Sequence, residues 1–133
     1  MQAAIYLRGS ANEGALARVT LAEQRKFCSE YCAREGLTVD RFFVDEGTSA
    51  IIADRPEFQR MLSYCLGRSG RIQYVVVYTL DRFARNTVDY ALIAALLKHL
   101  GIRVQSAREP IDPLATGALI DSILAAFAQV DKL

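Results

Sequence analysis

The sequence is poor in the residues that form disulfides and bind metal ions. Its 133 residues include one histidine, His99, and three cysteines, Cys28, Cys32 and Cys65. An odd number of cysteines without a paired CxxC spacing is neither a disulfide framework nor a zinc site. Cys28 and Cys32 share a helix face, but half a metal site has no partner in His99, which lies in an apolar helix. We therefore expect buried thiols, a cytoplasmic protein and no metal or cofactor.

Long apolar runs and runs of like charge are also absent. The N-terminal apolar stretch is too short for a signal peptide, and no stretch reaches membrane-spanning length, so we expect a soluble protein without a membrane partner. The formal net charge is +1, which does not announce a nucleic-acid partner. Of the 16 lysines and arginines, however, only Lys26, Lys98 and Lys132 are lysine. The excess of arginine favours forked binding of phosphate or carboxylate.

The common phosphate-binding motifs are missing. The sequence has no GxxxxGK[ST] loop, and the glycine-containing stretch 67–71 precedes an expected strand instead of following one, so it is interpreted as a surface turn. The carboxylates Asp45, Glu46 and Asp81 are too few, and too mixed with arginine, for a two-metal site. A metal-free reaction is the simpler interpretation.

The length and the 52% hydrophobic content predict one domain, residues 1–133, with a single core. Short apolar runs alternate with helical stripes, a pattern typical of strand-helix-strand units. The predicted fold is a three-layer α/β domain with a central, mostly parallel sheet of four or five strands. The expected strands are 3–7, 37–44, 74–79 and 102–105. The third contains three valines in a row, as a central strand covered on both faces does.

Helix signals lie between these strands. Thr20 with Glu23 resembles a capping box and Gly36 a stop, while Pro56 and Gly67 suit the two ends of a second helix. A third helix begins near Asn86 and ends before Gly101. The second helix is expected to bury one apolar face, formed by Phe58, Met61, Leu62, Cys65 and Leu66. The apolar positions expected in the core from the third helix are Leu92, Ala95, Leu96 and Leu100.

A long C-terminal helix is expected from about residue 116 to residue 133. Its apolar residues cover most of its circumference, so we expect part of it to face another subunit or a continuation of the chain. The sequence stops within this helical pattern, as a fragment of a longer protein does.

Polar residues follow three of the expected strands. The carboxyl ends of parallel strands share one edge of a sheet, where ligands bind. The hydroxyl of Ser10 and four guanidinium groups are thus expected along this edge. Gln24 lies on the inward stripe of its helix, an odd place for an amide without a polar partner. The residues that follow the strands are Arg8 and Ser10, then Asp45, Ser49 and Arg55, then Asp81, Arg82 and Arg85.

This set of residues suits attack by a serine on a phosphodiester. Arginine forks hold phosphate oxygens and balance the charge of the transition state. Acyl transfer would need a histidine near Ser10, and His99 lies on a helix that runs away from the edge. Duller explanations exist for each residue alone: Ser10 bonding loop backbone, Arg55 pairing with Asp54 or Glu57, and a capping Asp81 followed by solvated arginines. Their convergence favours a site.

The residues resemble the N-terminal catalytic domain of the serine recombinases, the group of resolvases, invertases and large serine integrases. Five motifs in order, over nearly the whole chain, carry the resemblance, and the Ser10-to-Asp81 spacing is more similar to the large members. The motifs are Tyr6-Leu7-Arg8-Gly9-Ser10, Thr20-Leu21-Ala22-Glu23-Gln24, Asp45-Glu46-Gly47-Thr48-Ser49 with Asp54-Arg55-Pro56, Leu80-Asp81-Arg82-Phe83-Ala84-Arg85-Asn86, and Glu109-Pro110-Ile111-Asp112 with the Gly117 helix.

The resemblance implies site-specific recombination of double-stranded DNA, without metal or nucleotide, through a 5′-phosphoserine ester. Ser10 would be the nucleophile, and subunits would exchange by rotation within a tetramer joined through the C-terminal helix. DNA-binding domains normally follow this domain and are absent from the sequence. Integration, excision and inversion are not distinguished. The residues that would activate the phosphate are Arg8, Arg55, Arg82 and Arg85, with Asp81 and Gln24 in support.

Three departures from the family pattern fall at Gly9, at Ala50 and at 129–132, and none removes an expected catalytic side chain. The alternatives are a catalytically idle relative that keeps the fold for assembly, a flavodoxin-like or response-regulator-like domain, and a small phosphohydrolase. A flavodoxin-like or response-regulator-like domain would need an acidic cluster where Arg8 and Ser10 stand.

Overall fold

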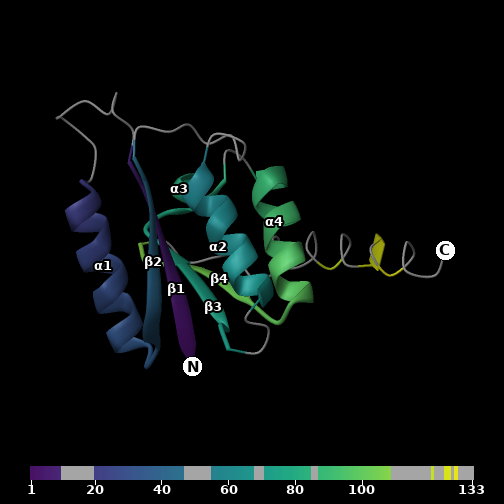
Figure 1. Ribbon diagram of the computed structural model, residues 1–133, viewed down its shortest axis with the longest axis horizontal. Coiled ribbons are helices and arrows are strands. Elements are labelled where there is room, and N and C mark those ends of the chain that lie inside the picture. Colours follow the sequence, from purple (N-terminus) through teal and green to yellow (C-terminus); the bar gives the residue numbers. More distant parts are fainter. Residues whose placement is uncertain are drawn as a thin grey trace.

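Strands and helices alternate along the chain in the computed structural model of the protein (Figure 1). The structure describes residues 1–9, 20–46, 55–67, 71–84 and 87–108, together with 121, 125, 126 and 128, but not the side chains of Asp81 and Thr87. The strands are β1 (Gln2–Gly9), β2 (Thr38–Glu46), β3 (Tyr74–Val77) and β4 (Arg103–Ser106). The helices are α1 (Leu21–Arg34), α2 (Pro56–Gly67), α3 (Leu80–Phe83) and α4 (Thr87–His99).

The four strands form one sheet in the order β2-β1-β3-β4. Every neighbouring pair is parallel, which confirms the predicted parallel sheet. β1 and β3 occupy its centre, and the three valines of β3 have no solvent exposure, as predicted for a strand covered on both faces. In the register, Tyr6 of β1 lies beside Val77 of β3, and Arg8 lies beside Asp45 of β2.

Helices cover both faces of the sheet, which confirms the three-layer prediction. α1 packs Cys28 and Cys32 against one face, while α2 and α4 cover the other (Figure 1). All three cysteines are buried and free, as expected. No helix in the described ranges is long and apolar enough to cross a membrane.

The helix ends agree closely with the sequence signals. The Thr20 hydroxyl accepts the Glu23 amide at 3.1 Å at the start of α1, and α2 runs from Pro56 to Gly67 as predicted. After α1, Gly36 has a φ of 70°, a left-handed conformation that suits glycine at the end of a helix.

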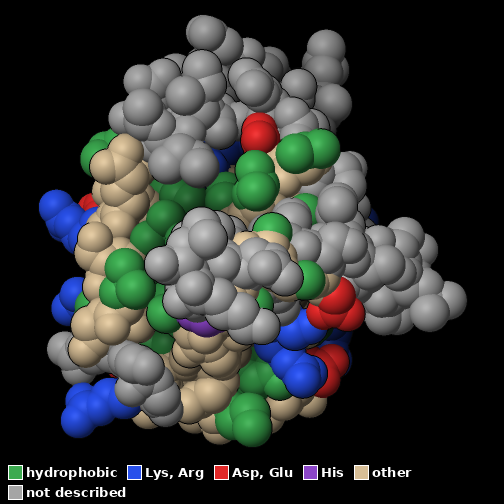
Figure 2. Space-filling view, turned by 90° about the vertical axis from the view of Figure 1, so that its right-hand side faces the viewer, with side chains coloured by type: hydrophobic (Ala, Val, Ile, Leu, Met, Phe, Trp, Pro, Cys, Tyr) green, Lys and Arg blue, Asp and Glu red, His purple; other side chains and the backbone are tan. Residues whose placement is uncertain are grey.

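Two parts of the predicted core are wrong. Leu66 is 54% exposed, because α2 turns by about 100° per residue and its buried face follows the spacing of Phe58, Met61 and Cys65. On α4, Leu92 and Leu96 are 47% and 40% exposed, and the buried face instead carries Tyr90, Ile93, Ala94 and Leu97. Hydrophobic side chains are accordingly visible on the side of the molecule that carries α4 (Figure 2).

The expected long C-terminal helix falls mostly outside the described residues and stays a prediction. Within this segment, Asp121 forms an ion pair with Lys98 of α4, and Asp121 Oδ1 lies 3.1 Å from Lys98 Nζ. This contact places residue 121 beside the last turn of α4.

Candidate functional site

Two site residues lie where the strand order reverses. From β1 the chain passes through α1 to β2 on one side, and later returns through α2 to β3 on the other side of β1. In open α/β sheets, ligands bind beyond the carboxyl ends of the strands at such a reversal. Arg8 is the next-to-last residue of β1, and Arg82 lies in the single helical turn α3 that follows β3.

The side chains of Arg8 and Arg82 each donate a hydrogen bond to the backbone carbonyl oxygen of the other residue. Arg82 Nη1 donates to the carbonyl oxygen of Arg8 at 3.2 Å, and Arg8 Nε donates to the carbonyl oxygen of Arg82 at 3.4 Å. Arg82 is only 5% exposed, so its interpretation as a solvated arginine is wrong. The two segments, 74 residues apart in sequence, are therefore joined at the edge of the sheet.

Arg55 joins the same pair from a third segment. Its Nη1 donates to the carbonyl oxygen of Arg82 at 3.2 Å, and its guanidinium carbon lies 4.1 Å from the ring centroid of Phe58. Arg55 does not pair with Glu57, whose carboxylate instead bonds Arg60. Arg8, Arg55 and Arg82 are hereafter the arginine cluster.

Gln24 supports the cluster from α1. The side chain is fully buried, and its Nε2 donates to the carbonyl oxygen of Arg8 at 3.1 Å. This is the polar partner that its inward position required. Four of the seven candidate side chains thus converge on two backbone carbonyls, those of Arg8 and Arg82.

The other candidate residues cannot be compared with the structure. Ser10, Ser49 and Arg85 lie outside the described residues. Asp81 belongs to α3, but its side chain is not described. Ser10 follows directly on Gly9, the last residue of β1. The placement of the predicted nucleophile therefore stays a prediction.

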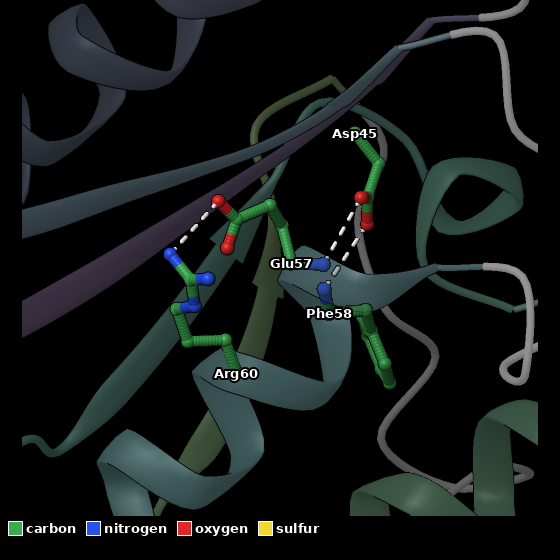
Figure 3. A network of polar contacts seen from close by, with 4 residues as sticks. All are labelled: Asp45, Glu57, Phe58 and Arg60. Carbon is green, nitrogen blue, oxygen red and sulfur yellow. Dashed lines mark hydrogen bonds and ion pairs between the residues drawn. The ribbon is translucent and has the colours of Figure 1, made fainter.

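Asp45 has a role that the sequence did not reveal. It was expected only as one of the polar residues after the predicted strand 37–44. Asp45 instead lies within β2 and is buried, and its carboxylate accepts the amides of Glu57 and Phe58, both at 3.0 Å (Figure 3). The carboxylate also accepts the Tyr6 hydroxyl at 2.8 Å. One signal was available: Arg55, just before the helix, has no acceptor to cap it, so another segment must supply one.

Arg55 is a buried cation with spare donors. It has no solvent exposure, and among the described residues neither Nε nor Nη2 has a hydrogen-bond partner. No ion pair to a described carboxylate compensates its charge. An unpaired buried charge is costly, and a phosphate, which takes two parallel hydrogen bonds from a guanidinium, is a fitting partner. The cluster is suited to bind an oxyanion.

Burial favours the protonated form of Tyr6 and of the three cysteines. Burial raises the pKa of Tyr6 well above its usual value, the hydrogen bond to Asp45 adds to this rise, and the Arg55 charge opposes it. Burial likewise raises the pKa of Cys28 to about 12 and that of Cys32 and Cys65 to about 11. A thiol needs its thiolate form to react. Burial therefore favours the protonated form of all four groups near neutral pH.

Metal ligands do not gather in this part of the molecule. Within the described ranges, no group of three or more histidine, cysteine, aspartate or glutamate side chains is close enough to hold an ion. His99 ends α4, next to the start of β4, so it lies at the opposite edge of the sheet from the cluster.

The parallel sheet and the arginine cluster at its carboxyl edge define an α/β domain with an oxyanion-binding edge. The model of the family described as "Resolvase, N terminal domain" matches residues 3–132. The chain belongs to this family.

Relatives agree with this membership. The transposon Tn21 resolvase of Escherichia coli is 31% identical over 104 residues, 74% of this chain and 52% of that protein. The chain thus spans about half the length of this curated relative. The N-terminal catalytic domain of TP901-1 integrase superimposes with a TM-score of 0.76 and 28% identity, over 99% of this chain and 97% of that one.

A more distant structure shows the same fold. The C-terminal catalytic domain of ISC1926 TnpA, an IS607-like serine recombinase, superimposes with a TM-score of 0.69, over 98% of this chain and 83% of that one. Its identity is 20%, so this likeness concerns the fold alone.

Proposed function

We propose that the protein is a serine recombinase, which breaks and rejoins double-stranded DNA at specific sites through a covalent bond between Ser10 and a DNA phosphate. One observation carries this proposal: three arginines from three separate segments meet at the carboxyl edge of β1 and β3. Family membership and relatives named as a resolvase and an integrase support the same class of reaction.

The proposed reaction transfers a DNA phosphoryl group from the 3′ oxygen of the DNA to Ser10 Oγ. Ser10 Oγ attacks the scissile phosphorus, a bond from Oγ to phosphorus forms, and the bond from phosphorus to the 3′ oxygen breaks. The proton that Oγ loses is balanced by the proton that the departing 3′ oxygen gains. Because a phosphate ester replaces a phosphate ester, reversal rejoins DNA without an external energy source.

The arginines would supply most of the acceleration. Arg8, Arg55, Arg82 and Arg85 would hold the non-bridging oxygens and balance their growing charge, with Gln24 and Asp81 in support. A single arginine aimed at a transferring phosphoryl group is worth about 10³ to 10⁵ in rate. The two spare donors of Arg55 are the described groups that such a phosphate would engage.

The proposed partners are DNA and further copies of the protein. Recombination needs two DNA sites held together, which we assign to a dimer and tetramer formed through the C-terminal helix, whose sequence is apolar around most of its circumference. DNA-binding domains beyond this domain would give site specificity. The three free, buried thiols suit a reducing compartment, so we place the reaction in the cytoplasm.

A polarity experiment tests the covalent step. The complete natural protein is incubated with duplex DNA that it has selected from a random pool, and the reaction is stopped with detergent. DNA labelled at its 3′ end should migrate with the protein, because the ester joins Ser10 to a 5′ phosphate. DNA labelled at its 5′ end should be released as a fragment with a free 3′ hydroxyl.

Two serine variants complete the experiment. Ser10→Ala should form no adduct, whereas Ser63→Ala, which removes an exposed hydroxyl of α2, should form it at the wild-type rate. An adduct that persists in Ser10→Ala refutes the nucleophile. Wild-type protein that binds DNA without forming an adduct would indicate the catalytically idle relative instead.

A further inference from the structure

The Asp45 carboxylate connects three elements at the edge of the sheet. Asp45 is the next-to-last residue of β2 and is 3% exposed. One oxygen accepts the Glu57 amide, and the other accepts the Phe58 amide (Figure 3). The second oxygen also accepts the Tyr6 hydroxyl. β1, β2 and the first turn of α2 are therefore fixed to one group.

The first turn of α2 fixes the position of Arg55. The Arg55 carbonyl oxygen accepts the amide of Gln59 at 3.1 Å, so Arg55 occupies the position where a helix normally carries its own capping side chain. Serine, threonine, aspartate and asparagine serve there because they have acceptors, and arginine has none. Asp45 caps the helix from β2 by accepting the amides of Glu57 and Phe58. The Arg55 side chain is therefore available to the arginine cluster.

Two aromatic rings extend the connection to the guanidinium group. The Arg55 guanidinium carbon lies 4.1 Å from the ring centroid of Phe58 and 5.6 Å from that of Tyr6. The two rings pack edge-on with their centroids 5.0 Å apart. Asp45 bonds the hydroxyl of one ring and the amide of the other residue. The Asp45 carboxylate thus binds both the residues that carry these rings and the first turn of α2.

We infer that Asp45 is a positioning residue of the reaction, which holds Arg55 beside Arg8 and Arg82 through Tyr6 and the first turn of α2. This inference rests on the proposed function, because only strand cleavage makes the position of Arg55 matter. Misplacement of a catalytic group by about 1 Å can cost about 100-fold in rate. A stabilising cap alone would not have this effect.

The first test follows the Arg55 side chain itself. Asp45→Asn keeps the size of the side chain but replaces one acceptor oxygen with a donor, so it cannot accept both amides of α2. In the nuclear magnetic resonance spectrum, the Arg55 Nε–Hε signal should shift, and its exchange with water should become about ten times faster. Asp40→Asn makes the same change at an exposed site on β2 and should leave this signal in place.

The second test measures cleavage at saturating DNA in the complete natural protein. Asp45→Asn should slow adduct formation by about 10- to 100-fold with unchanged DNA affinity. In an Arg55→Ala background, the same substitution should slow it by less than about threefold, because a residue that acts through Arg55 loses its effect when Arg55 is absent. Ile102→Val, a mild change in the core before β4, controls for lost stability.

The outcomes separate the two ideas. An unmoved Arg55 signal, or equal rate losses for Asp45→Asn with and without Arg55, overturns the positioning role and leaves the proposed function intact. A wild-type protein without any adduct overturns the proposed function. If Asp45→Asn does not fold, Tyr6→Phe decides, since it removes a single hydrogen bond and should shift the Arg55 signal in the same direction by less.

Discussion

Replacing Arg55 by methionine should make the protein more stable but slow adduct formation by about 10³-fold or more. Arg55 is the largest of the fully buried side chains in the described residues, and no described carboxylate forms an ion pair with it. Methionine has similar length and fills an irregular space with no charge and no donors. A residue kept at a cost to folding is one whose charge is needed for another purpose, so the direction of this change tests the binding role directly.

The magnitude follows from the contacts of the guanidinium group. Its loss removes a charge-assisted hydrogen bond to the Arg82 carbonyl and a cation–π contact with Phe58, together worth about 2 to 4 kcal/mol. The substitution also removes two buried donors without acceptors, which should raise the free energy of unfolding by about 1 to 3 kcal/mol for each donor. It removes the charge repulsion from Arg8 and Arg82 as well. The Arg82 carbonyl still accepts Arg8 Nε. We expect a net gain of about 2 kcal/mol, or about 6 °C in Tm.

Urea unfolding at neutral pH, in buffer without phosphate, measures the gain. Arg60→Met is the matched control, because Arg60 is 71% exposed on α2, the helix that Arg55 precedes, and pairs with Glu57. The stability of this variant should differ from that of wild type by less than about 0.5 kcal/mol. Added sulfate should stabilise wild type more than Arg55→Met, since a bound anion favours the folded state. If Arg55→Met is less stable than wild type, the guanidinium is part of the scaffold and our reasoning fails.

Two further predictions concern the cysteines and the glycines. Because burial raises the pKa of Cys28 to about 12 and of Cys32 and Cys65 to about 11, the folded protein should react slowly with a thiol reagent at pH 8. Reaction should accelerate as pH rises toward 11, and unfolding in urea should expose all three at once; rapid labelling of native protein would contradict the burial. Gly36→Ala should lower the free energy of unfolding by about 1 kcal/mol, since alanine resists a φ of 70°. Gly67→Ala, at a helix end with no heavy atom within 4 Å and no positive φ, should be neutral or stabilising by less than about 1 kcal/mol in thermal unfolding.

Local signals made the elements predictable. Pro56 and Gly67 mark the two ends of α2, and Thr20 caps α1 as its spacing to Glu23 indicated, because these effects act over a few residues. The convergence of Arg8, Arg55 and Arg82 followed from a parallel sheet, which brings separate strand ends to one edge.

What could not be predicted depends on contacts between distant segments. The groups that organise the cluster are the carbonyl oxygens of Arg8 and Arg82, and every residue has such an oxygen, so no letter of the sequence marks them. Asp45 caps a helix that begins 11 positions later, and capping motifs cover only neighbouring residues. Leu92 and Leu96 of α4 are as apolar as its buried residues, and only the packed structure separates them.

The position of β1 between β2 and β3 affects how the chain is made on the ribosome. The first strand to emerge is a central one, and its neighbour β3 is completed only at Val77. Arg82 emerges later still. A polypeptide interrupted before that point carries Arg8 without Arg82, the residue with which it exchanges hydrogen bonds, so truncated products of translation lack the assembled arginine cluster.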